Sequence, residues 1–516
     1  MKQKKKLFNG VIALILAQGI VKILGFVYKI YLANKEGFGD IGNAIYNSGY
    51  QIYALLLTIS AIGVPNAIAK LVAEQRYSYD KVEIAKILKT SVIIFAVIGS
   101  FMTALLIIGS KYIANNLLNI PEATYSIIAL APAIFNVCIL SVYRGYFNGM
   151  NKIDITAKSQ TIEQFLKTVF TIVLVEIFFL ISNANTVVMA TVANLATTFA
   201  TLCGLIYLYR KNDGNIKVKF EKKYISRILK VSIPISLSSI LASLNRNIDS
   251  ITVVRFLKKS LSESEAKIQY GILSGKVDVI SSAPVSFVVA IATTIIPKIA
   301  GLKNKKDINE IARKYIIITV LLIMPCVIAL IGFSGQILQV LFGSSRGKEL
   351  LVISAISLFF ISIEQIVHAI LQGIGKVFIP TIALSIGVII KTILNIKLIG
   401  STNIYIGGIK GTCIATMICH IVACTISFSC MARFLKIKFN FFKYILKPLI
   451  SSCIMLLSLY SIYFLLIGII MENIAIILAI GVAVIMYVIS IFSLKILDKE
   501  DILSIPIFNK LFFRKK

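Results

Sequence analysis

The sequence has few acidic residues and almost no histidine. Asp and Glu number 23 against 54 Lys and Arg, and only two histidines, His368 and His420, occur in 516 residues. No HExxH motif or His/Cys cluster is present, so we expect no metal and no cofactor. The eight cysteines include no CxxC pair and lie mostly in apolar segments, which argues against a disulfide framework.

Motifs of ATP-driven and catalytic proteins are also missing. The two segments nearest to a P-loop, GILSGKV and GSSRGKEL, lack the spacing and the Ser/Thr of GxxxxGK[ST]. The loops expected outside the membrane are short and leave little room for the catalytic acids of a membrane glycosyltransferase. We therefore predict that the chain is not an enzyme and has no ATPase of its own.

Apolar sequence dominates what is present. Hydrophobic residues make up 58% of the chain and the mean hydropathy is +0.89. Apolar windows long enough to cross a hydrocarbon core of about 30 Å recur along its whole length. We predict an all-α integral membrane protein with 14 transmembrane helices, at 7–33, 42–73, 84–110, 123–147, 154–181, 185–209, 224–257, 271–301, 310–333, 349–373, 377–399, 406–435, 441–469 and 472–495.

The net charge of +31 is unevenly distributed. When the predicted loops are assigned alternately to two sides, most Lys and Arg fall on the side that also holds both termini. This bias is the positive-inside rule, so both termini are expected in the cytoplasm. The basic residues orient the chain and favour anionic membrane lipids as partners, and we expect no nucleic acid.

The two halves of the chain resemble each other. FNGMNK (147–152) and LQGIGK (371–376) each join two helices by a tight turn, and Lys167-Thr168 recurs at the same offset as Lys391-Thr392. Parallel repeats of this kind are typical of secondary transporters, with the substrate site between the lobes. The predicted domains are an N-lobe with TM1–6 (1–221), a C-lobe with TM7–12 (222–435), and TM13–14 with a cytoplasmic tail (436–516).

Polar residues interrupt the first helix. Gln18, Lys22 and Lys29 follow one helical stripe. A cation at bilayer depth costs about 3 kcal/mol or more, so Lys22 either snorkels to an interface or faces an aqueous cavity. The alignment of the stripe favours the cavity.

Other apolar segments also carry cations. Arg246 and Asp249 form either a self-neutralising pair or an anion contact tuned by the carboxylate, and Lys276 is either interfacial or cavity-lining. The embedded cations outnumber nearby carboxylates, which suits an anionic substrate such as a polyphosphate headgroup. The candidate substrate-binding residues are Lys22, Arg246, Lys276, Gln18, Lys29, Asp249, Lys167 and Lys391.

Two i, i+4 pairs include a carboxylate, namely Glu163 with Lys167 and Glu364 with His368. The second is either a local pair or a protonatable coupling site, because His changes charge near neutral pH. Arg144, which ends the fourth helix, is interpreted as a cytoplasmic anchor. The candidates for coupling or gating are Glu163, Glu364, His368, and the equivalent second-helix prolines of the two lobes, Pro65 and Pro297.

Four stretches together resemble the polysaccharide-transporter branch of the MOP superfamily. They are IVKILGFVYKIYLAN, LLLTISAIGVPNAIAKLVAEQ, YRGYFNGMNKIDITAKSQTIEQ and SAPVSFVVAIATTIIPKIAG. Within that branch the chain is most similar to stage V sporulation protein B and the MurJ-like lipid II flippases. The resemblance implies a MATE/MurJ-like, two-lobed fold of 14 helices whose central cavity alternates between inward- and outward-open states.

The resemblance also implies roles for single residues. Lys22 falls where MurJ-type proteins have a cavity arginine before LGF, and Lys276 falls near their basic residue at the start of the eighth helix. Tyr28 stands where MurJ proper tends to have a second arginine, which fits the sporulation-type branch better.

These inferences combine into one expected function. The chain is interpreted as a monomeric flippase in the bacterial cytoplasmic membrane for an undecaprenyl-pyrophosphate-linked saccharide, foremost lipid II, driven by an ion gradient or the membrane potential. It is expected to contact membrane lipids and the cell-wall synthesis machinery. The alternatives are an exporter of a capsule, teichoic acid or O-antigen precursor, a multidrug extruder of the same superfamily, and a scaffold without transport.

Overall fold

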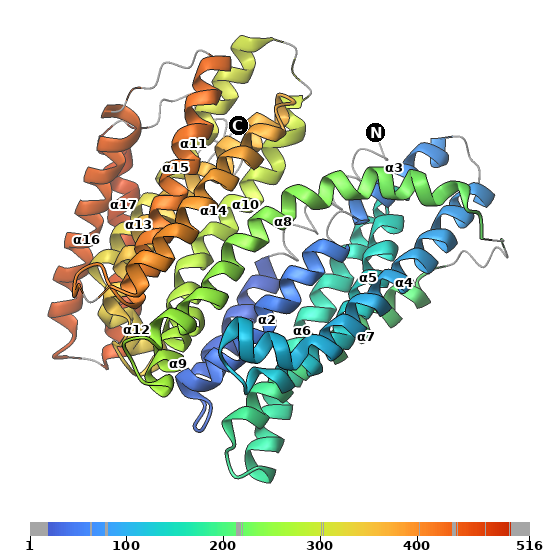
Figure 1. The fold of residues 1–516 in the computed structure, drawn as a ribbon. Helices are drawn as coiled ribbons and strands as arrows, with labels where there is room; N and C mark the ends of the chain where they lie inside the picture. The colour runs from blue at the N-terminus through green and yellow to red at the C-terminus, as the bar shows by residue number, and fades with distance from the viewer. Residues whose placement is uncertain are drawn as a thin grey trace. The chain divides into compact units, whose positions relative to one another are not determined.

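The computed structural model describes residues 19–61, 64–77, 81–212, 218, 220–300, 302, 304–401, 403–435, 440, 442–469, 471–494 and 496, which contain helices and no strand (Figure 1). The helices are 19–34, α2 Gly39–Ala61, α3 Val64–Tyr77, α4 Lys81–Tyr112, α5 Ala123–Gly149, α6 Ile153–Ile181, α7 Thr186–Arg210, α8 Lys223–Leu257, α9 Glu263–Ile272, α10 Asp278–Ala300, α11 Lys305–Gly332, α12 Ser334–Phe342, α13 Lys348–Gly373, α14 Phe378–Ile399, α15 Ile409–Leu435, α16 Lys447–Leu466 and α17 Glu472–Ser493. Single π-helical segments lie at Ile113–Leu118, Leu273–Val277 and Phe442–Leu446.

The all-helical membrane fold predicted from the sequence is confirmed. Within the described residues, 11 helices are long and apolar enough to span a bilayer, and most begin and end within a few residues of the predicted bounds. The predicted helix 42–73 corresponds to two described elements, α2 ending at Ala61 and α3 beginning at Val64, with residues 62–63 outside the described part. Pro65 is the second residue of α3, and proline suits a first helical turn. The total of fourteen stays a prediction.

The outer face of α4 shows what surrounds these helices. Val97, Phe101 and Ile108 are 66%, 62% and 84% exposed. A water-soluble protein rarely exposes such a continuous apolar face, whereas acyl chains solvate it well. The protein is therefore a multi-pass membrane protein.

The chain folds into two compact units. Unit 1 comprises Met1–Val279 and Thr392–Thr412, and unit 2 comprises Ile280–Lys391 and Cys413–Lys516. In unit 1, α5 packs against α2, α3, α4 and α7, while α6 lies along α7 and α2 also packs on α8 and α9 (Figure 1). The helix α5 is thus the core of unit 1. The lobe boundaries predicted at 221 and 435 stay a prediction.

Two glycines let α5 approach α3 closely. Gly145 and Gly149 are spaced as in GxxxG, the small-residue pattern of tightly packed membrane helices. A Cβ at Gly145 would lie 2.7 Å from the Pro65 carbonyl oxygen, and one at Gly149 would lie 2.7 Å from Val72 Cβ. The backbone of α3 therefore occupies the space where larger residues of α5 would project.

In unit 2 the last two helices attach to α11 through tyrosine hydroxyls. Pro325 lies inside α11 and has no N–H to donate to the carbonyl of Leu321, four residues earlier. The Tyr487 hydroxyl donates to this carbonyl at 2.7 Å, and Tyr460 donates to the Gly332 carbonyl at 2.7 Å. A hydrocarbon environment offers no hydrogen-bond donor to a freed carbonyl, so α16 and α17 supply the donors that α11 lacks.

The predicted repeat recurs as backbone geometry in each unit. The Lys152 N–H donates to the Phe147 carbonyl, and the Lys376 N–H donates to the Leu371 carbonyl, both at 2.8 Å. The residues before these lysines, Asn151 and Gly375, both have positive φ, 61° and 80°. Both turns are thus the same left-handed helix end, a conformation that Asn and Gly tolerate best.

The connection before α8 is polar. The Glu221 carboxylate lies 2.8 Å from Lys86 Nζ and 3.1 Å from Lys223 Nζ. The hydrogen bond from Lys86, followed by that from Lys223, lowers the pKa of Glu221 below its usual value.

Gly149→Ala tests the close contact of α5 with α3. We expect it to destabilise the protein by about 1–3 kcal/mol through overpacking, although alanine favours a helix by about 1 kcal/mol. Gly109→Ala in α4 is the matched control, because its Cβ would meet only Ile113 Cδ1 at 3.5 Å. The measurement is the thermal midpoint in detergent, followed by a thiol-reactive dye that reports exposure of buried cysteines. Equal midpoints for the two variants would contradict the packing argument.

Tyr487→Phe tests the hydrogen bond to the proline-freed carbonyl. Removing one hydroxyl leaves the Leu321 oxygen without this donor and is expected to cost about 1 kcal/mol. The same thermal assay measures it, with Tyr125→Phe, an exposed tyrosine of α5, as control. An unchanged midpoint for Tyr487→Phe would show that this bond contributes nothing.

Candidate functional site

Lys167 is a buried cation surrounded by tyrosines in unit 1. It lies near the middle of α6, is 5% exposed, and places Nζ 4.3 Å from the Tyr50 ring centroid and 5.2 Å from that of Tyr28. Tyr46 stacks on Tyr50, and its hydroxyl lies 3.3 Å from that of Tyr28. We call Lys167, Tyr28, Tyr46 and Tyr50 the tyrosine–lysine cluster.

The cluster keeps a positive charge at bilayer depth without a carboxylate. Within the described part of the chain, Lys167 takes part in no ion pair. A cation–π contact contributes about 2 kcal/mol when desolvated, and a cation at the bilayer centre costs about 3 kcal/mol or more. Two ring contacts are therefore enough to offset much of that cost while the charge itself remains.

The first helix and α6 run side by side in the same direction. The Thr168 hydroxyl lies 3.4 Å from the Leu24 carbonyl oxygen, and Tyr31 near the helix end donates to Glu176 at 2.6 Å. On this helix Lys22 is exposed and Lys29 is partly buried. Lys29 directly follows Tyr28, the buried member of the tyrosine–lysine cluster on this helix, whereas Gln18 lies outside the described residues.

Glu163 is bound to Arg144 rather than to Lys167. Arg144 donates to the Glu163 carboxylate at 2.8 Å and to Ser159 at 3.3 Å. The side chain of Arg144 is 15% exposed and is paired with this carboxylate, and the interpretation of Arg144 as a cytoplasmic anchor stays a prediction. The i, i+4 spacing suggested Lys167 as the partner of Glu163, but Arg144 of the neighbouring helix α5 binds the carboxylate instead.

Lys276 is part of a buried ion pair. Its Nζ lies 2.7 Å from Asp40 Oδ1, and its side chain is 6% exposed. Gly275 makes the approach possible, since a Cβ there would lie 2.4 Å from the Asn43 side chain. Asp40 thus neutralises the charge of Lys276, and the choice between an interfacial and a cavity-lining position stays a prediction.

Asp249 faces α14 within unit 1. Asn395 donates to Asp249 Oδ1 and to the Thr252 hydroxyl, both at 3.0 Å. The side chain of Arg246 lies outside the described residues, so its pairing with Asp249 stays a prediction. Lys391, the repeat counterpart of Lys167, is 1% exposed in α14.

The pair predicted in the tenth helix belongs to a larger cluster in unit 2. Glu364 is 2% exposed, and its Oε2 lies 2.7 Å from His420 Nδ1 of α15. His368, the predicted partner, is 3.7 Å from Oε1 and interacts with the Ser427 hydroxyl at 3.0 Å. The primary partner of Glu364 is thus His420, a residue that spacing along one helix could not reveal.

The two gating candidates are prolines at helix ends. Pro65 is the second residue of α3, and its carbonyl faces Gly145, as described above. Pro297 lies near the end of α10, and its side chain is outside the described residues. Among the described residues, no group of three or more His, Cys, Asp or Glu is placed to hold a metal ion.

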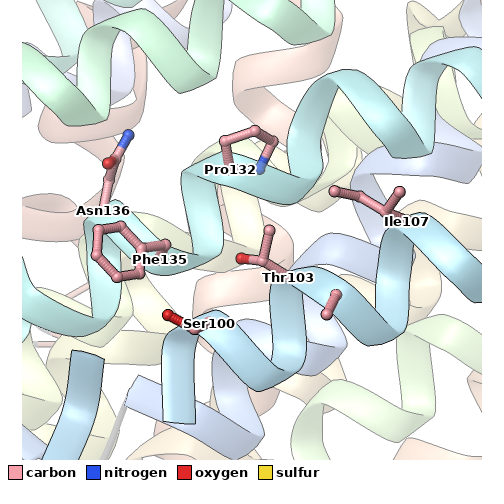
Figure 2. Close-up of a pocket in the computed structure, with 7 residues that line it drawn as sticks. Ser100, Thr103, Ile107, Pro132, Phe135 and Asn136 are labelled. Carbon is pink, nitrogen blue, oxygen red and sulfur yellow. The ribbon is translucent and has the colours of Figure 1, made fainter. Parts of the chain in front are cut away.

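A groove lies between α4 and α5, and none of its lining residues is charged (Figure 2). It has a volume of about 380 Å³ and is lined by Ser100, Thr103, Ala104, Ile107, Pro132, Phe135 and Asn136. Two of its three polar side chains are engaged, since Thr103 donates to the Ala131 carbonyl and Asn136 to that of Thr198. The groove is suited to an acyl chain and not to a charged headgroup.

Sequence reasoning missed the tyrosines, Asp40 and His420. A signal for the tyrosines was present, because Tyr46, Tyr50 and Tyr53 follow i, i+4, i+7 on α2 and form one aromatic face. His420 could have been found as one of only two histidines. Asp40 offered no signal, since its lysine partner is distant in sequence.

Removing one partner of the Arg144–Glu163 pair should destabilise the protein more than removing both partners. Glu163→Ala leaves a guanidinium at membrane depth without its carboxylate, and the expected loss is about 3 kcal/mol, because the pair is partly exposed. Arg144→Met/Glu163→Leu removes both charges and is expected to recover most of that loss. Thermal midpoints of the full chain measure both. A double variant no more stable than Glu163→Ala would refute the pair as described.

Comparison with known proteins agrees with this architecture. The chain matches the family described as polysaccharide biosynthesis protein over residues 7–303, and the MatE family over residues 234–396. The lipid II flippase MurJ of Bacillus subtilis (strain 168) is 27% identical over 424 residues, which cover 76% of this chain and 77% of that protein. Stage V sporulation protein B of the same organism is 24% identical over 523 residues, which cover 99% and 100%.

A solved structure shares the fold. The lipid II flippase MurJ in an inward closed conformation superposes with a TM-score of 0.73 at 18% identity, covering 94% of this chain and 99% of that chain. The fold is therefore the one predicted from the sequence. Because the first family match spans more than half of the sequence, the chain belongs to the polysaccharide biosynthesis protein family of the MOP superfamily.

Proposed function

We propose that the protein is a flippase that carries an undecaprenyl-pyrophosphate-linked saccharide, foremost lipid II, across the bacterial cytoplasmic membrane by alternating access. The headgroup would pass through a polar cavity between the lobes while the polyprenyl tail remains in lipid. The protein would act as a monomer, with both termini in the cytoplasm, and would be neither an enzyme nor a scaffold. Family membership supports lipid-linked saccharides as the substrate class.

One observation carries the proposal, namely the charge of Lys167. Its ammonium is buried at mid-helix and held by tyrosine rings instead of a carboxylate. The buried cations Lys276 and Lys267 of unit 1 are paired with carboxylates, Lys276 with Asp40 and Lys267 with Glu122 and Glu263. The partly buried Arg144 is paired with Glu163. The positive charge left over attracts an anion and repels a cationic drug, which argues against a multidrug extruder.

The chemistry of the cations suits a phosphate headgroup that moves. Lysine binds phosphate as a flexible point charge, whereas arginine fixes it through a bidentate fork. Lys22, Lys29 and Lys167 lie on the first helix and on the α6 beside it, so a pyrophosphate could pass from one ammonium to the next. Arg246, Lys276, Asp249, Gln18 and Lys391 remain proposed contacts elsewhere in the pathway.

The names of the two relatives narrow the choice of candidate substrates. One relative is a lipid II flippase, and the other is a sporulation protein that aligns along the whole chain. Lipid II is therefore the first candidate, and a different lipid-linked saccharide is the second, because the family description names polysaccharide biosynthesis in general.

Rescue of a bacterium depleted of its own lipid II flippase tests the proposal. Wild type is expected to restore growth, and Lys167→Met to reduce colony formation at least about tenfold. A charge-assisted contact contributes about 1.5–3 kcal/mol, and 1.4 kcal/mol is a factor of ten in affinity. Lys167→Arg keeps the charge and should retain partial function.

Lys111→Met, at an exposed lysine at the end of α4, is the matched control. Membrane expression is equalised, and lipid II reaching the outer leaflet is measured directly. Full rescue by Lys167→Met would remove the proposed site. Failure of a well-inserted wild type would instead favour a teichoic acid, capsule or O-antigen precursor.

A further inference from the structure

Both histidines of this chain converge on one buried carboxylate. His368 comes from α13 and His420 from α15, and they approach opposite oxygens of Glu364 at 3.7 and 2.7 Å. The carboxylate is 2% exposed and lies within a helix apolar enough to span the membrane. No part of the substrate site proposed above uses these groups.

The facing helices present these groups at matching intervals. On α13, Glu364 and His368 are one turn apart, and on α15 His420 and Ser427 lie two turns apart on one face with Cys424 between them. Cys424 is buried and is a further titratable group on that face. The cluster is thus a contact between two helices and not a feature of one helix.

The surrounding helices bring few other charges to the cluster. The charged residues of α11, which packs on α13, lie between Lys305 and Lys314, and Lys314 is bound to Glu310 at 2.8 Å. Other titratable groups on α11 are Tyr315 and Cys326, and α12 has none. On α14, which meets α15 where Gly387 approaches the Cys419 carbonyl, Lys391 follows one turn later.

The position of His368 indicates that the cluster is more than a simple ion pair. The Glu364–His420 contact alone would satisfy a buried carboxylate. A second imidazole adds a nitrogen, Nε2, that lies 3.0 Å from the Ser427 hydroxyl and 3.7 Å from Glu364 Oε1. A small movement of α13 against α15 would transfer this nitrogen from the hydroxyl to the carboxylate, and the cluster would then adopt a second hydrogen-bonding arrangement.

The ligand that fits this cluster is a proton. Na⁺ and other hard cations prefer several oxygen ligands, whereas two of the three groups here are imidazole nitrogens. A transition metal needs its ligands directed at one shared point, but these nitrogens approach different oxygens of the carboxylate. Imidazole and carboxylate both bind and release protons in the physiological range when their environment shifts them there.

We infer that Glu364, His420 and His368 form a proton-binding site that couples proton movement to transport. Without the proton, a carboxylate faces two neutral imidazoles, and the net charge is −1. With it, the Glu364 carboxylate pairs with one imidazolium, and the net charge is 0. Only an N–H bond forms on uptake, and on release the proton returns to water.

The change of one charge is large enough to matter for transport. A charge that moves across the membrane is driven by the membrane potential, so a site that gains or loses one charge responds to that potential. The neutral state is favoured in a low-dielectric environment, and the charged state when the site is open to water. Proton occupancy would therefore bias unit 2 between two states. The coupling role rests on the proposed transport function, whereas the proton site stands on geometry alone.

The composition of the chain makes a direct test possible. Because His368 and His420 are the only histidines, nitrogen NMR of ring-labelled histidine in the full chain, reconstituted in lipid, reports on this cluster alone. Both imidazole signals are expected to change in a coupled manner between about pH 5 and 8. In Glu364→Gln the coupled change is expected to disappear, since the shared carboxylate is gone.

Ser357→Ala is the matched control, because this buried residue of α13 bonds only to the Ile353 carbonyl of its own helix. It should titrate as wild type does. If Glu364→Gln does not fold, His368→Gln, which keeps a side-chain partner for Ser427, is used and should uncouple the remaining histidine. Wild-type imidazole signals that do not change over this range, or that change equally in Glu364→Gln, would overturn the proton site.

A second measurement separates this inference from the proposed function. In cells rescued by the protein, collapse of the pH gradient at constant membrane potential is expected to abolish rescue by wild type. Rescue that survives this collapse would refute proton coupling and leave the flippase proposal intact. If wild type does not rescue at all, the NMR titration still decides whether the proton site exists.

Discussion

A lipid bilayer supplies no hydrogen-bond partners, and the structure of this chain follows from that constraint. Every backbone carbonyl freed by a proline and every embedded charge must find a partner within the protein. Pro325 releases the carbonyl of Leu321, and Tyr487 of the last helix binds it. The same need joins α5 to α6 through Arg144 and Glu163. The contacts that pack the helices together are therefore also the contacts that give polar groups their partners.

The embedded charges are stabilised in three different ways, which differ in the net charge that remains at the site. The Lys276–Asp40 pair cancels its own charge and holds α2 against the π-helical segment Leu273–Val277. The tyrosine–lysine cluster stabilises an ammonium without cancelling it, so an anion is still attracted. The cluster around Glu364 is the proposed proton site, whose charge would change on proton binding. In the proposed function, structure, recognition and coupling thus use different chemistry at separate places.

The two halves share a backbone but have diverged in side chains. The turns at 147–152 and 371–376 repeat the same hydrogen bonds. At the position equivalent to Glu163, the second half has Gly387, and a Cβ there would lie 2.7 Å from the Cys419 carbonyl oxygen. Where the first half places an ion pair, the second half therefore brings two helix backbones together. Its carboxylate lies instead on α13, facing the histidines.

The sequence by itself determined the all-helical membrane fold, most helix bounds, the repeated turns and the identity of the embedded charges. These follow from local hydropathy, from charge bias and from proline and glycine positions, which act over a few residues. The tertiary structure alone decided which charges are neutralised. Glu163 pairs with Arg144, Glu364 with His420 and Lys276 with Asp40, and Lys167 lies among tyrosines of two other helices. Partners that come from different helices are set by rotation and depth of packing, and periodicity along one helix carries no information about either.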